Sequence, residues 1–245
     1  MQGGSIRLFK IFGVEVFLHF SWFLVAAYQF SVRRHEYVSA IFPICEYIAL
    51  FVIVLMHEFG HALACRQTGG TADRIMLWPL GGIAFVRPPE RAGAQLWAIA
   101  AGPLVNVCLI PVLLVASLVA GAFSGSYGAS DPRKLLSEIQ SINLALLLFN
   151  LLPFYPLDGG QILRSLLWFP LGRIRSLQVA SAIGFVGGII GGAAGVYYFG
   201  SLWIGVMAFF LVSQAAVGWR HARELTLAEE QARLAPVELE RPPVI

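Results

Sequence analysis

The stretch that decides the fold is Ile48-Ala-Leu-Phe-Val-Ile-Val-Leu-Met-His57-Glu58-Phe59-Gly60-His61, in which an apolar run leads directly into an H-E-x-x-H sequence. Two histidines four residues apart lie one turn above each other on a helix, so both imidazoles can bind one metal ion. Glu58 is rotated by one residue from His57, which lets its carboxylate reach a water at the metal without being a ligand. Charged side chains cost roughly 2.5 to 3.5 kcal/mol each at the centre of a bilayer, so three ionisable groups here imply a metal, polar partners or water.

The composition of the whole chain places this stretch in a membrane. Hydrophobic residues make up 58% of the chain, charged residues only 13%, and the mean hydropathy is +0.73. A helix that spans a bilayer needs about 20 mostly apolar residues. The candidate spans are residues 14–32, 41–65, 92–123, 137–152, 176–198 and 201–218. We therefore expect an all-α membrane protein with about six transmembrane helices in one intramembrane domain, residues 1–218, followed by a charged cytoplasmic tail, residues 219–245.

The amino terminus has a different pattern from the spans. Ser5-Ile-Arg-Leu-Phe-Lys-Ile-Phe-Gly-Val14 interleaves charges with apolar residues, whereas a signal peptide carries its charges ahead of one apolar block. No cleavable signal peptide is expected. The alternation predicts a short strand or hairpin that turns near Gly13, ahead of the first span.

The positions of Lys and Arg predict the orientation in the membrane. With six spans and a cytoplasmic amino terminus, only four of the 17 Lys and Arg fall on the far side. These four are Arg33, Arg34, Arg133 and Lys134. We therefore expect a multi-pass protein of the cell membrane with both termini in the cytoplasm and a metal site that receives water from that side. The net charge of +3 reflects this topology, and no nucleic-acid partner is expected.

A catalytic zinc site has three protein ligands and one open position, and Asp158 is the best candidate for the third ligand. It follows Pro153 and Pro156, which stop the fourth span from continuing as a regular helix. Irregular backbone at membrane depth is tolerated only where it is buried in protein or lines a wet cavity. The fourth span is expected to end at the depth of His57 and His61. An aspartate in an ordinary Asp-Gly turn is the alternative.

Two other side chains on the second span compete for the role of third ligand. Cys65 lies roughly 12 Å along the helix axis from His57, and Glu46 lies roughly 16 Å away in the other direction. One ion cannot bridge such distances. Cys65 is expected to pack in the core, and Glu46 to hydrogen-bond inside the helix bundle.

Four motifs in this order resemble the site-2 proteases, intramembrane zinc metalloproteases that cleave transmembrane or membrane-proximal segments of other proteins. They are His57-Glu-Phe-Gly-His61, Pro79-Leu-Gly-Gly82, Ala101-Gly-Pro-Leu-Val-Asn106 and Asn150-Leu-Leu-Pro-Phe-Tyr-Pro-Leu-Asp-Gly-Gly160. The resemblance covers residues 46–164. The 96 residues between the second histidine and the aspartate leave no room for a PDZ domain, and the tail is too short for an appended regulatory domain, which predicts a compact subgroup.

The resemblance implies roles for individual residues. His57, His61 and Asp158 would bind one Zn²⁺ per chain, and Glu58 would be the general base. Asn150 would contact the substrate or its transition state close to the metal. Close helix packing explains the motif that ends at Asn106 as well as a direct catalytic role does.

The resemblance also implies a membrane-embedded β-hairpin after the second helix, in residues 74–86. Gly81, Gly82 and Ile83 would contact a substrate in extended form, since a helical substrate must unwind and a sheet edge offers its backbone new hydrogen-bond partners. The alternative is that these strands only cover the helix bundle.

The expected function is hydrolysis of peptide bonds in or near transmembrane segments, as in regulated intramembrane proteolysis. The family suggests anti-sigma factors, transcription-factor precursors and signal-peptide remnants as substrates in the lipid bilayer, without choosing among them. Three alternatives stay open: a membrane protease of another architecture, a metal transporter, and a proteolytically inactive scaffold that binds membrane segments. The sequence indicates neither the trigger nor the oligomeric state.

Overall fold

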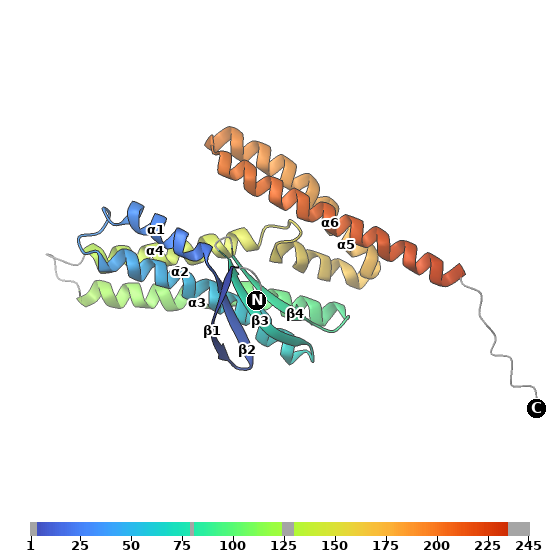
Figure 1. Cartoon of the computed structure of the whole chain (residues 1–245), viewed down its shortest axis with the longest axis horizontal. Helices are drawn as coiled ribbons and strands as arrows, with labels where there is room; N and C mark the ends of the chain where they lie inside the picture. Colours follow the sequence, from blue (N-terminus) through green and yellow to red (C-terminus); the bar gives the residue numbers. More distant parts are fainter. Residues whose placement is uncertain (1–3, 79–80, 124–129, 235–245) are drawn as a thin grey trace, which may run out of the picture. The chain divides into compact units, whose positions relative to one another are not determined.

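The computed structural model describes residues 4–78, 81–123 and 130–234, which form six helices and one four-stranded sheet (Figure 1). The chain divides into two compact units. The first contains Met1–Pro153 and Leu157–Leu166, and the second contains Phe154–Pro156 and Leu167–Ile245. All four strands, helices α1 to α4 and the start of α5 therefore belong to the first unit.

The predicted amino-terminal hairpin is present. Strand β1 (Ser5–Ile11) pairs antiparallel with β2 (Val14–His19). The two residues of the turn, Phe12 and Gly13, both have positive φ, of 48° and 76°. Two-residue hairpin turns favour this conformation because its twist matches that of the strands, and glycine adopts it without steric cost.

The second predicted hairpin, β3 (Thr71–Trp78) and β4 (Gly81–Arg87), joins the first in one sheet. Strand β2 pairs parallel with β3, so the strand order is β1-β2-β3-β4 and β4 lies at an edge. This pairing of the two hairpins was not predicted from the sequence. A parallel pair needs a long crossover, and α1 and α2 supply it here.

The sheet packs against helix α2 (Ile41–Gln67), the helix that carries the H-E-x-x-H sequence. The core between them is made of side chains at most 4% exposed. Its members include Val14, Val16, Val54, Ala62, Cys65, Ala72, Ile75 and Leu77. Cys65 is fully buried in this core, as expected, and its thiol donates to the carbonyl of Thr71.

Four helices in the described residues are long and apolar enough to cross a membrane, by length and composition. They are α2, α3 (Ala92–Phe123), α5 (Asp158–Phe199) and α6 (Leu202–Leu234). Their sides expose large apolar side chains, as expected where lipid replaces water. The chain is therefore a multi-pass, mainly helical membrane protein, which confirms the predicted fold class.

Two of the six expected spans are not among these four helices. Residues 14–32 are no single helix, because β2 is followed by the 13-residue helix α1 (Ser21–Arg33), about 20 Å long against the roughly 30 Å of a hydrocarbon core. Hydropathy alone does not separate an apolar strand from the apolar helix after it. Helix α4 (Ser130–Asn150) begins seven residues before the expected span 137–152, and four charged residues among its first nine lower its hydropathy below that of the four spans above.

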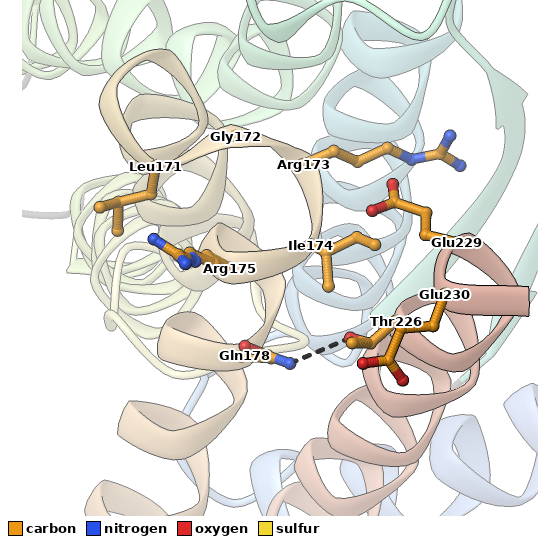
Figure 2. A pocket seen from close by; sticks show the side chains of 9 residues that line it. All are labelled: Leu171, Gly172, Arg173, Ile174, Arg175, Gln178, Thr226, Glu229 and Glu230. Carbon is orange, nitrogen blue, oxygen red and sulfur yellow. Dashed lines mark hydrogen bonds between the residues drawn. The ribbon is translucent and has the colours of Figure 1, made fainter. Parts of the chain in front are cut away.

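The second unit contains most of α5 and all of α6. At Gly172, with φ of 78° and ψ of 175°, α5 is interrupted. Beside this break lies a cavity of about 470 Å³ whose lining includes two arginines and two glutamates (Figure 2). Helix α6 runs without a break through Gly218, so the domain boundary expected there stays a prediction, and residues 235–245 of the tail lie outside the described residues.

Candidate metal centre

The two histidines of the H-E-x-x-H sequence lie on one face of α2, as their spacing predicts. Their Nε2 atoms are 3.1 Å apart, and their rings are perpendicular, with an interplanar angle of 85°. His57 is 3% exposed and His61 is 6% exposed. Both side chains are therefore held in the interior of the first unit.

Asp158 comes to the same point from a distant part of the chain. It stands in the first turn of α5, after the irregular segment that follows α4. Its Oδ2 lies 3.0 Å from the Nε2 of His57 and 3.4 Å from the Nε2 of His61. The expected convergence of these three residues is thus present, although Asp158 begins a helix and is not in a loop.

The three side chains fit a zinc ion. Their donor atoms all lie within 4.8 Å of one another, and two nitrogens with one oxygen are a donor set that zinc enzymes use. Donors at about 2.0 to 2.2 Å from a tetrahedral ion lie about 3.3 to 3.6 Å from each other. The observed separations of 3.0 to 3.4 Å are close to this spacing.

Each histidine is also held at its other ring nitrogen. The Nδ1 of His57 lies 2.6 Å from Oδ1 of Asn106, and the Nδ1 of His61 lies 2.9 Å from the carbonyl oxygen of Ala98. An acceptor at Nδ1 keeps the proton there and leaves the Nε2 lone pair free for a metal. The motif that ends at Asn106 therefore has a part in the site, and the absence of a side chain at Gly102 makes room for the rings, since a Cβ there would lie 2.2 Å from Nε2 of His61.

Glu58 lies between the three candidate metal ligands and strand β4. It is 5% exposed. A Cβ on Gly82 would lie only 2.2 Å from Cγ of Glu58, so β4 can approach this closely only with glycine at that position. The backbone amide of Ala84 donates to the Glu58 carboxylate. The hairpin is thus in direct contact with the predicted general base.

The three hairpin residues predicted to contact a substrate are consecutive in β4. Gly81 pairs with Trp78, Gly82 with Leu77 and Ile83 with Met76 in the ladder to β3. In the described part of the chain, β4 is the last strand on its side of the sheet. Asn150, the last residue of α4, also reaches the site, with its Nδ2 3.5 Å from Nε2 of His57.

Comparisons with known proteins agree with this geometry. Residues 46–126 and 115–192 match Peptidase family M50. A zinc metalloprotease of Methanocaldococcus jannaschii is 36% identical over 182 residues, which are 74% of this chain and 50% of the relative. A curated relative from Synechocystis is 29% identical over 240 residues, 91% of this chain and 62% of the relative. The solved structure of a site-2 protease from Methanocaldococcus jannaschii gives a TM-score of 0.60 at 28% identity and covers 88% of this chain and 95% of that chain.

Fold and site together define a helical membrane unit with a site able to hold a metal ion beside a sheet edge. The chain belongs to peptidase family M50, the family of the site-2 proteases. The family and the zinc cofactor predicted from the sequence are therefore confirmed. The chain spans about half to three fifths of the length of the two curated relatives.

Proposed function

We propose that this chain hydrolyses peptide bonds in or next to transmembrane segments of other membrane proteins. The position of Glu58 carries the proposal. Glu58 lies in the helix turn that joins the two histidines. Its side chain is buried and packs against Gly82 of an edge strand. An acid–base group, a metal site and a template for an extended peptide thus meet at one place.

Strand β4 provides the template. A helical substrate hides its peptide bonds in its own hydrogen bonds and must unwind before cleavage. A free strand edge gives the unwound backbone new partners, and Gly81, Gly82 and Ile83 are the residues that would make these contacts. Since Gly82 has no side chain, the backbone of this part of β4 lies directly against the side chain of Glu58.

The side chains divide the chemistry among them. His57, His61 and Asp158 would hold zinc, which when bound is a Lewis acid that lowers the pKa of water and polarises a carbonyl group. Glu58 takes the proton of the attacking water and delivers it to the leaving nitrogen. Asn150 points its amide nitrogen at the site and would donate to the developing oxyanion.

The protein would lie in the cell membrane with both termini and the entrance to the site in the cytoplasm. Arg33 pairs with Glu138 at 2.9 Å and Lys134 pairs with Glu36 at 2.8 Å, so basic residues of the expected far side lie together at one end of the first unit, which supports their placement on one side of the membrane. In a chain without its native cysteines, we expect an impermeant thiol reagent outside sealed cells to label a cysteine at Arg34 and to leave one at Asp73 unlabelled. The reverse pattern would invert the topology.

The proposed substrates are membrane proteins such as anti-sigma factors, transcription-factor precursors and signal-peptide remnants. The test compares native membranes that contain the zinc-loaded chain with membranes that contain the Glu58→Gln chain, by mass spectrometry of newly formed amino termini. We expect new termini in or beside transmembrane segments only with the wild-type chain. They should disappear when a chelator removes zinc and return when zinc is restored. Identical termini in both membranes would refute the proposed activity.

A further inference from the structure

Two asparagines beside the metal centre are fully buried in the helix bundle. Asn106 on α3 and Asn143 on α4 are both 0% exposed. A buried amide is costly unless its donors and acceptors are hydrogen-bonded, and more so in a protein surrounded by lipid. The contacts of these two side chains therefore have to be explained together.

Their hydrogen bonds form a series in which the donor and the acceptor of each bond are fixed. Nδ2 of Asn143 donates to the backbone carbonyl of Asn106 at 2.9 Å. A carbonyl oxygen only accepts, so the Asn143 amide cannot be turned round without losing this bond. Its Oδ1 is then left to accept from Nδ2 of Asn106, at 2.8 Å. The Asn106 amide is oriented in turn, and its Oδ1 faces Nδ1 of His57 at 2.6 Å.

The last hydrogen bond of this series, between Asn106 and His57, determines which nitrogen of His57 carries the proton. In a neutral imidazole, an acceptor at Nδ1 keeps the single proton there, so Nε2 keeps its lone pair for a metal. Nε2 is the atom that lies 3.0 Å from Asp158 and 3.1 Å from His61. With the Asn106 amide reversed, an NH₂ group would face Nδ1, and the proton would move to Nε2, where it blocks metal binding.

We propose that Asn143 is a positioning residue of the metal site, which fixes the tautomer of His57 through the Asn106 amide. The inference rests on the proposed role of His57 as a zinc ligand. Nothing in the H-E-x-x-H sequence requires an asparagine on the fourth helix, and Asn143 acts through another side chain. A merely structural role, in which the two asparagines only join α3 to α4, makes different predictions.

The first test replaces Asn143 by leucine, which has a similar volume and cannot orient the Asn106 amide. In the purified full chain, we expect zinc affinity to fall roughly 10-fold to 100-fold, measured by competition with a fluorescent zinc chelator. In the zinc-loaded protein, ¹⁵N NMR of the histidines should show one of the two zinc-bound rings losing the hydrogen bond of its Nδ1–H. The other should keep it, because Ala98 holds His61 independently.

Two further variants serve as controls. Ser141→Ala removes a hydroxyl group from the same helix. This hydroxyl donates to the carbonyl of Ser137 within α4, so its loss should leave zinc affinity unchanged. If the leucine variant does not fold, Asn143→Ser replaces it. A serine side chain is one bond shorter than asparagine, so it stays polar but does not hold the Asn106 amide in one orientation.

A double-mutant cycle separates positioning from packing. Asn106→Asp offers His57 an acceptor whichever way its carboxylate turns, so adding Asn143→Leu to it should have little further effect on zinc affinity. An equal loss in both backgrounds, or a folded Asn143→Leu chain with wild-type affinity and histidine spectra, would overturn the inference. Both readouts are independent of proteolysis. A chain that meets these expectations and cuts no substrate would refute the proposed function and leave this inference standing.

Discussion

Replacing Glu58 by glutamine is expected to abolish peptide-bond cleavage and to leave zinc and fold in place. Glutamine has nearly the same shape and still fits against Gly82, but its amide cannot accept the proton of the attacking water. General acid–base catalysis contributes about 10² to 10⁴ in rate, and here one side chain would both take and deliver the proton. The side chain is no part of the group of three that could hold the metal, so zinc content should not change.

The measurement is the rate of product formation in proteoliposomes together with the zinc content of the same sample. Glu15→Gln is the matched control, since it makes the same chemical change on β2, where Glu15 pairs with Arg7 at 3.1 Å. That variant should cleave like the wild type. Substantial cleavage by Glu58→Gln would remove Glu58 from its role as base, and loss of zinc would instead place it among the metal-binding groups.

The elements that the sequence predicted well are those set by local pattern. Apolar runs of sufficient length gave α2, α3 and the later spans, and alternation about Gly13 gave the first hairpin. The parallel pairing of β2 with β3 joins segments about fifty residues apart, and no local pattern encodes it. The same limit explains the expected span at residues 14–32, where the strand and the short helix after it have the hydropathy of one continuous helix.

In the site, too, residues set by local pattern could be predicted and residues set by tertiary packing could not. Helix spacing predicted that His57 and His61 lie together, and the break in a span at matching depth predicted that Asp158 joins them. The structure brings the three side chains together as expected. Asn106 was recognised only as part of a motif, because its partner depends on how α3 packs against α2. Asn143 was not singled out from the sequence. A fully buried amide on a span is visible only once the helices are assembled, although an asparagine within an apolar run is the feature that would prompt the question.

Replacing Arg33 by methionine is expected to destabilise the first unit by about 3 to 5 kcal/mol, because it leaves a buried carboxylate without its charge partner. Glu46 is 2% exposed, and Arg33 contacts both of its oxygens, with Nε at 3.0 Å from Oε1 and Nη2 at 3.1 Å from Oε2. The hydrogen bonds from Gln29 and Tyr37 remain but do not neutralise the charge. This network confirms the expected hydrogen bonding of Glu46 inside the bundle.

The free energy of unfolding, measured by denaturant titration in mixed micelles, checks this expectation. Arg34→Met is the control, since it removes the same formal charge from the neighbouring residue, which is exposed and contacts His35. It should change stability by less than about 1 kcal/mol. The double variant Arg33→Met with Glu46→Gln should recover most of the loss, because a neutral amide needs no charge partner: its oxygen can accept from Gln29 and its NH₂ group can donate to the hydroxyl of Tyr37. Equal effects of the two arginine changes would mean that Glu46 finds water or another partner, and the network would then not hold α1 to α2.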